Sequence, residues 1–80
     1  MNNRKYGPAW PSNVDLPTDQ ASMSDRDWIR FYERHIRDIE TAPSPDRYRL
    51  ADTRRVLLLH RRSHFAALGK PCPRWKGRLV

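Results

Sequence analysis

A four-residue break at residues 41–44, between two stretches with helical periodicity, constrains the fold of this 80-residue chain most strongly. Pro43 disfavours helix at the residue before it, and Pro45 suits the first turn of a following helix, where its missing N–H costs nothing. A connection this short usually folds two helices back on each other. The sequence therefore predicts an all-α fold, an antiparallel hairpin of helices at about residues 25–40 and 45–68.

The first predicted helix has a clear start and a single apolar face. Ser24 is a good N-cap, and Asp27, three residues later, can complete a capping box. At about 100° per residue, the apolar side chains fall on one stripe. They are Trp28, Ile29, Phe31, Tyr32, His35, Ile36 and Ile39. Arginines and glutamates occupy the other side, which is typical of an amphipathic helix.

The second predicted helix has two apolar faces. We expect Ser44 to cap its start and Gly69 to follow its last turn, with Pro71 preventing continuation. The main face, which should pack on the first helix, contains Leu50, Ala51, Leu57, Leu58, His64, Phe65 and Leu68. The weaker opposite face contains Tyr48, Val56, Leu59, Ala66 and Ala67. Two faces imply two neighbours: the first helix, and either the N-terminal arm, a second copy or a different protein.

Segments without helical periodicity flank the predicted hairpin of residues 24–69. Residues 1–23 hold three prolines, which resist helix and predict an extended arm. Tyr6 and Trp10 are large apolar groups on a segment that cannot build its own core. We expect them to dock, either on the chain's own helices or on a partner protein. Residues 70–80 form a basic tail.

The net charge of +7 is the main compositional anomaly, and all of the excess positive charge follows residue 44. Such a balance favours an anionic partner: nucleic acid, an acidic protein surface or anionic lipid. Arginines supply most of this charge, and their planar guanidinium groups bind phosphate and carboxylate in bidentate fashion. The position of the arginines therefore matters more than their number.

Two arginine pairs lie seven residues apart in the second predicted helix, Arg54 with Arg55 and Arg61 with Arg62, and Arg47 extends one row. Within each row, the guanidinium groups lie about 10 Å apart along the helix, a spacing that matches phosphates or a line of carboxylates. The alternative is a solvated face with contacts to the acids of the first helix. Arg54 and Arg61 border the packing face, where their long side chains can snorkel.

The tail combines cations with an aromatic ring, in Arg74, Trp75, Lys76 and Arg78. This combination of basic and aromatic residues resembles segments in which cations bind phosphate while the ring stacks on a base or inserts into a membrane surface. Contact with nucleic acid, docking on protein and a plain basic tail all remain open.

Metal binding and catalysis are weakly indicated. His60 and His64 are four residues apart, and His35 with Cys72 could complete four zinc ligands. The usual second ligand pair is missing, however, and two of these histidines lie on apolar faces, so we expect no metal. No catalytic triad, glycine-rich phosphate loop or inward carboxylate pair is recognisable, and we expect no enzyme activity and no cofactor.

A single cysteine excludes an internal disulfide, and no apolar run approaches the length of a membrane span. We therefore expect a protein of the cytoplasm or of the inside of a viral particle. A two-helix hairpin is marginal alone, which favours a homo-oligomer or a larger assembly.

The leading functional hypothesis is a small non-enzymatic adaptor or accessory subunit. It would dock through its hairpin and arms, with Tyr6, Trp10, Tyr48, Val56 and Leu59 as contacts, onto a larger assembly that can contain nucleic acid. A virus- or phage-encoded structural or inhibitory protein would suit its size. The alternative is direct, sequence-tolerant binding of DNA or RNA by the arginine rows and the tail.

Overall fold

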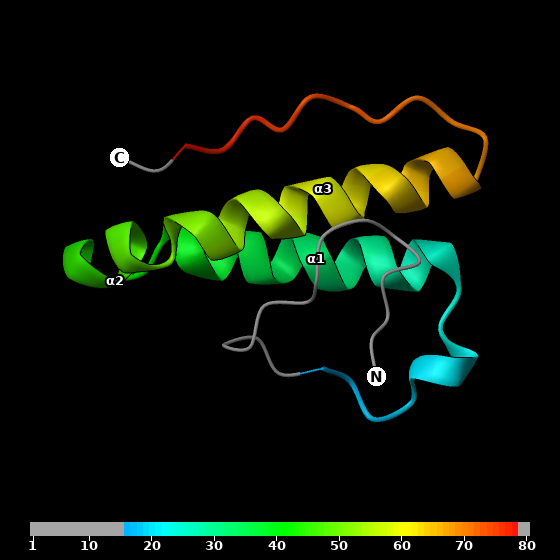
Figure 1. Cartoon of the computed structure of the whole chain (residues 1–80), viewed down its shortest axis with the longest axis horizontal. Coiled ribbons are helices and arrows are strands. Elements are labelled where there is room, and N and C mark those ends of the chain that lie inside the picture. The colour runs from blue at the N-terminus through cyan, green and yellow to red at the C-terminus, as the bar shows by residue number, and fades with distance from the viewer. Residues whose placement is uncertain (1–15, 79–80) are drawn as a thin grey trace.

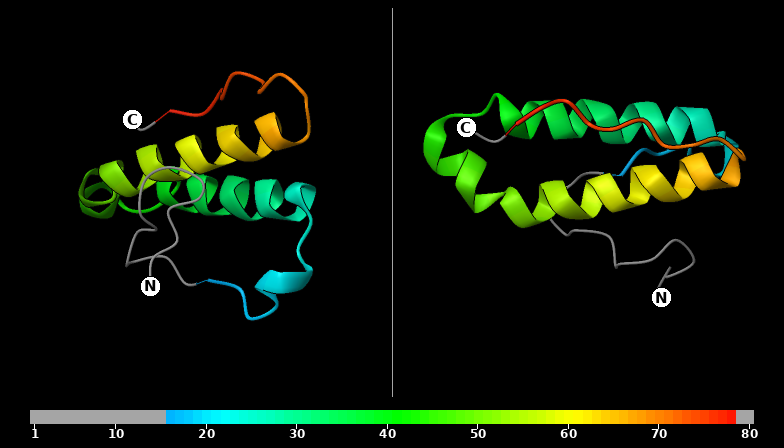
Figure 2. Two further views of the ribbon diagram at one scale, coloured as in Figure 1. Left: turned by 45° about the vertical axis from the view of Figure 1, so that its right-hand side comes forward. Right: turned by 90° about the horizontal axis from the view of Figure 1, so that it is seen from above.

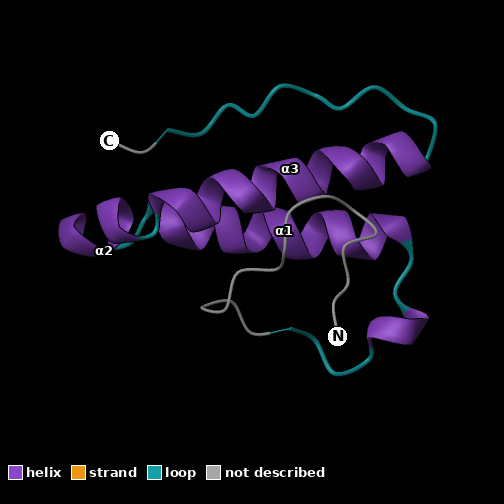
Figure 3. Ribbon diagram, in the orientation of Figure 1, coloured by secondary structure: helices purple, strands orange, loops and turns teal. Residues whose placement is uncertain are grey.

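The computed structural model describes residues 16–78, which form four helical elements and no strand (Figure 1). A 3-10 turn, η1 (Gln20–Ser22), precedes the helices α1 (Asp25–Glu40), α2 (Ser44–Arg49) and α3 (Ala51–Ala67). The two long helices, α1 and α3, pack side by side in antiparallel directions, and the short α2 joins them (Figure 3). The prediction of an all-α fold built on two antiparallel helices is confirmed.

The start of α1 is the predicted capping box. The Ser24 hydroxyl accepts a hydrogen bond from the Asp27 N–H at 3.1 Å, and the Asp27 carboxylate accepts one from the Ser24 N–H at 3.0 Å. These bonds satisfy two of the donors that a helix start leaves open. The backbone and hydroxyl bonds from Ser24 also hold the pKa of Asp27 below its ordinary value, because they favour the charged carboxylate.

The connection after α1 differs from the prediction at its cap. Pro43, not Ser44, takes the N-cap position of α2, with an extended ψ of 151°, and its carbonyl accepts hydrogen bonds from the next turn. Ser44 is instead the first helical residue, and Pro45 lies within the first turn. The prediction of Ser44 as the cap is therefore wrong, although the start of the helix is displaced by one residue only.

The single helix predicted over residues 45–68 is also wrong, because a turn at Leu50 separates α2 from α3. Leu50 has φ −98° and ψ 13°, and its side chain is half-buried against the core. Seen from above, α2 crosses from the end of α1 to the start of α3 (Figure 2). Packed helices lie about 8–10 Å apart. A straight helix from Ser44 could not both bridge that gap and then run along α1.

The core lies along the contact between α1 and α3. Its buried cluster consists of Tyr32, Ile36, Ile39 and Leu57, with half-buried Trp28, Phe31, Leu50, Leu58 and Trp75 packed against it, and Ile29 of α1 is buried as well. The apolar stripe predicted for the first helix is thus confirmed. Full burial of an Ile or Leu side chain contributes about 1.5–3 kcal/mol. Since the core is this small, the polar contacts around it matter more than in a larger domain.

The end of α3 is a glycine-terminated helix, as predicted. Gly69 has φ +72°, in the left-handed region that only glycine adopts without strain. Its N–H bonds to the Ala66 carbonyl at 3.0 Å, and the Lys70 N–H bonds to the Phe65 carbonyl at 3.2 Å. This pair of bonds is the Schellman motif. The chain then reverses and residues 70–78 run back along the two helices (Figure 1).

No helix in the described part of the chain is long and apolar enough to cross a bilayer. The predicted docking residues Tyr6 and Trp10 lie outside the described residues.

Candidate interaction surfaces

The returning tail is anchored by Trp75, whose indole lies against the core between α1 and α3. Its Nε1–H donates a hydrogen bond to Glu40 Oε2 at 2.8 Å. The same carboxylate oxygen accepts from Arg54 Nε at 2.8 Å and lies 2.7 Å from Arg54 Nη2. Arg54 Nη2 also donates to the Gly77 carbonyl at 3.2 Å. One glutamate therefore joins α1, α3 and the tail.

Arg61 forms a second junction and is almost fully buried, with 6% of its side chain exposed. Its Nε donates to Glu33 Oε2 at 2.8 Å, across the interface between α1 and α3. Its Nη1 donates to the Pro73 carbonyl at 3.1 Å and to Cys72 Sγ at 3.3 Å. Hydrogen bonds to a charged guanidinium are stronger than neutral ones, so Arg61 fixes the first half of the tail on the helices.

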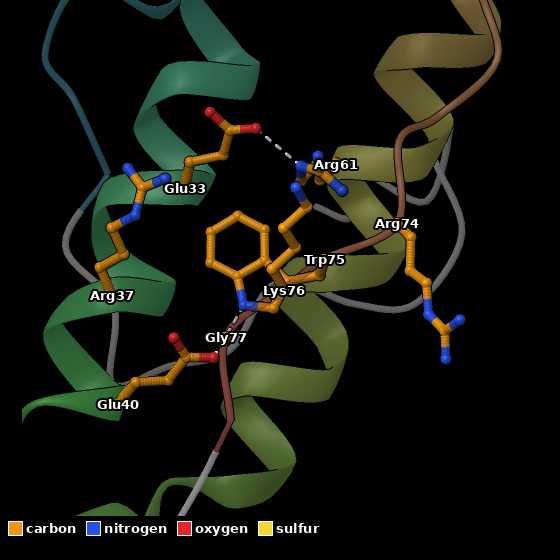
Figure 4. Close-up of a pocket in the computed structure, with 8 residues that line it drawn as sticks. All are labelled: Glu33, Arg37, Glu40, Arg61, Arg74, Trp75, Lys76 and Gly77. Carbon is orange, nitrogen blue, oxygen red and sulfur yellow. Dashed lines mark hydrogen bonds and ion pairs between the residues drawn. The ribbon is translucent and has the colours of Figure 1, made fainter.

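Beside Trp75 lies an open pocket lined by Glu33, Arg37, Glu40, Arg61, Arg74, Trp75, Lys76 and Gly77 (Figure 4). The guanidinium carbons of Arg37 and Arg61 lie 5.3 and 5.1 Å from the Trp75 ring centre. Both distances fit a cation–π contact. Among residues 16–78, Arg37, Arg74 and Lys76 have no ion-pair partner. The pocket rim is therefore positive, whereas its two glutamates are already bound by arginines.

A buried hydrogen-bond chain joins the opposite end of the helix pair. His64 Nδ1 lies 2.8 Å from Asp25 Oδ1, and His64 Nε2 lies 3.0 Å from the Tyr32 hydroxyl. The order of groups resembles the acid, base and hydroxyl of a catalytic relay. Tyr32 and His64 are each only 2% exposed, however. The bonds satisfy the buried Tyr32 and His64 groups and, with Asp25 at the partly exposed edge, connect α1 to α3.

The four residues considered as metal ligands do not meet. His35 packs edge-on against Phe31, with ring centres 4.5 Å apart, and His60 lies 5.7 Å from the Tyr32 ring. His64 is engaged in the buried chain, and Cys72 contacts Arg61. Within the described range, no three His, Cys, Asp or Glu side chains are close enough to hold a metal ion.

The two outward arginine rows expected on the second helix are not formed as rows. Arg47 donates to the Ala42 carbonyl at 3.2 Å, and Arg54 and Arg61 turn toward α1. Arg54 and Arg61 contact Glu40 and Glu33, as expected from the alternative of contacts with acids of the first helix. Only Arg55 and Arg62 of this set remain exposed. The reason is the match in position between these inner arginines and the two glutamates at the edge of the α1 stripe.

The weaker face predicted for the second helix is exposed in part. Leu59 is 42% exposed, Val56 is half-buried, and Tyr48 on α2 is 62% exposed. Arg55 and Arg62 lie four residues before and three residues after Leu59 on the same side of the helix. An apolar side chain between two cations is thus presented outward.

A further basic surface was not expected from the sequence. Arg26, Arg30, Arg34 and Arg37 on α1 are all exposed. In the sequence they alternate with acids and read as a neutral, solvated face. In the structure, the charges of two of those acids are neutralised, because Glu33 and Glu40 form ion pairs with Arg61 and Arg54 of α3. The sequence does contain a signal for this inward pairing, because both glutamates border the apolar stripe of α1 on a helical wheel.

The fold and its surfaces define a small helical protein with a positively charged exterior. Comparison of the chain with protein-family models, with curated proteins and with solved structures finds no match. Its function is therefore argued from its own residues.

Proposed function

We propose that the protein is a small non-enzymatic adaptor that docks onto a larger assembly through the outer face of α3. The observation that carries this proposal is the exposure of Leu59 between the unburied cations Arg55 and Arg62. A partner surface with an apolar pocket between carboxylates would complement it. In such an interface, the buried apolar contact supplies affinity, while the charges set orientation and association rate.

Other features support an adaptor. Tyr48, exposed on α2, and Val56, half-buried on α3, are the further contacts that the sequence predicts. The core consists of few residues, so a partner surface would add stability that the chain alone cannot supply. Tyr6 and Trp10, the other predicted contacts, belong to the same proposal. The expected location is the cytoplasm or the inside of a viral particle.

The test is affinity capture from the cells that make the protein, with quantitative mass spectrometry. Leu59→Gln should reduce the recovery of a stoichiometric partner at least 10-fold, because it removes the apolar contact at an already exposed position. Arg49→Gln, an exposed change on α2, is the control and should retain the partner. Equal recovery with Leu59→Gln and wild type would contradict docking through this face. A second copy of the chain as partner would appear as a dimer in sedimentation, lost in the same variant.

A second candidate function is direct, sequence-tolerant binding of nucleic acid. It is favoured by an asymmetry of burial: of the described residues, eleven of fourteen Lys and Arg are exposed, against four of eight Asp and Glu. The exterior is thus more positive than the composition suggests. Such binding should weaken steeply between about 50 and 200 mM salt, by roughly 10³-fold for six phosphate contacts. Absence of binding to any duplex or single strand at low salt would exclude it.

A further inference from the structure

We propose that the nucleic-acid-binding face is the outer side of α1 and not the arginines of α3. This face consists of Arg26, Arg30, Arg34 and Arg37, and Lys76 of the tail continues it. Its ligand is the phosphate backbone of DNA or RNA. The proposal rests on the second candidate function and adds the place and the mode of binding.

The spacing of the four arginines forms one continuous stripe. On a helix with about 100° per residue, positions 26, 30, 34 and 37 fall within an arc of about 80°. They span about 16 Å along the axis at 1.5 Å per residue. All four side chains are exposed. A row of this length can follow several successive phosphates of one strand.

The inward pairing of the glutamates gives this stripe its charge. Glu33 and Glu40 lie beside it in sequence, but their carboxylates bind Arg61 and Arg54 at 2.8 and 2.7 Å. Asp27 is bound in the capping box, yet it stays exposed and lines with Asp19 a pocket that Arg30 and Arg34 also line. Asp38 alone remains as an exposed acid in the last turns of α1. The four arginines and Lys76 face solvent beside three exposed acids, Asp19, Asp27 and Asp38, so the stripe keeps a net positive charge, which is what a polyanion requires.

The stripe joins the tail at the Trp75 pocket. Arg37 lines this pocket together with Arg74 and Lys76, which come from the tail and are also exposed (Figure 4). The folding back of residues 70–78 therefore adds cations to the α1 surface. In an extended tail, these charges would lie away from the helix pair.

The state of Trp75 determines the mode of binding. Its indole N–H is bonded to Glu40, and its ring carries guanidinium contacts from Arg37 and Arg61. It is thus engaged within the fold and does not act as a platform for stacking bases. Binding should depend on the backbone only, without the preference for single strands that aromatic stacking confers.

The experiment compares two matched double variants by fluorescence anisotropy, with a labelled duplex and a labelled single strand as probes. Arg30→Gln with Arg37→Gln removes two cations seven residues apart on α1. Arg55→Gln with Arg62→Gln removes two exposed cations seven residues apart on α3. The α1 variant should lower affinity for both probes about 10-fold or more at low salt and reduce the salt slope by about 2. The α3 variant should stay within about threefold of wild type, a margin that covers long-range electrostatics.

Since Arg37 contacts Trp75, a second α1 variant separates binding from tail docking. Arg26→Gln with Arg34→Gln touches no residue of the tail and should give the same loss. Equal losses in the α1 and α3 variants would overturn the placement while leaving nucleic-acid binding intact. A marked preference for the single strand would overturn the backbone-only mode. No binding by the wild type would overturn this proposal and the second candidate function together, while the adaptor proposal would stand.

Discussion

Arg61 and Arg62 are neighbours in the sequence, yet their side chains have opposite environments. Arg61 is buried and bound to Glu33, Cys72 and Pro73, whereas Arg62 is exposed. A helical wheel places Arg61 at the border of the packing face, and from there a long side chain can turn either way. The choice depends on whether an acid lies opposite. The position of that acid is set by α1, so the sequence of α3 alone could predict only that Arg61 points either to solvent or toward an acid of α1.

This difference predicts a large contrast in stability. Arg61→Ala leaves the Glu33 carboxylate without its partner and frees the tail at Pro73, so it should lower the free energy of unfolding by about 3 kcal/mol. Arg62→Ala should change it by no more than about 0.5 kcal/mol. Urea unfolding followed by circular dichroism measures both. Similar values for the two variants would show that the Arg61 contacts do not hold the fold.

At the scale of the helices, the start of α1 and the end of α3 are more predictable from the sequence than the course between them. Ser24 with Asp27 and Gly69 carry local signals, because a cap involves only residues within one turn. The break at Leu50 carries none: its residue type is a good helix former. It follows from the need to bridge two packed helices, which is a property of the whole fold. Local pattern thus predicted α1 in full but merged α2 and α3.

The capping box of α1 makes stability depend on pH in a defined direction. Hydrogen bonds from Ser24 lower the pKa of Asp27 from its ordinary 3.8, so the unfolded chain binds the proton more readily. The carboxylate therefore stabilises the fold above pH 3.8, and this contribution is lost as the pH falls through the lowered pKa. Wild type should exceed Asp27→Ala in urea stability near neutral pH, and the gap should narrow below pH 3.8.

Thr18→Ala, an exposed change upstream of the cap, is the matched control for this measurement. It should follow the wild-type pH curve throughout. If the difference between wild type and Asp27→Ala were constant down to the lowest pH, the capping bonds would not be the source of the effect.

For the molecule as a whole, the tail acts as a third structural element packed on the two long helices. The sequence indicated its basic and aromatic character but not its docking, because residues 70–78 have no periodicity that reports a neighbour. Trp75 supplies apolar contact to the core, and Arg54 and Arg61 donate to tail carbonyls. A hairpin with so few buried side chains gains from such a layer, since each added contact is a large fraction of its total stability.

Truncation after Gly69 should therefore destabilise the helices, although it removes no helical residue. The loss of half-buried Trp75, at the low end of the range for large aromatic truncations, predicts about 3 kcal/mol. For a chain of this size, that corresponds to a fall in the melting temperature of roughly 12 °C or more.

Gly77→Ala is a milder test, because its added Cβ would overlap the Glu40 carboxylate and the Trp75 indole. It should loosen the docked tail and speed tryptic cleavage after Arg74 and Lys76, whereas Lys70→Ala should not. Unchanged melting of the truncated chain, or unchanged cleavage of Gly77→Ala, would mean that the tail does not pack on the helices in solution.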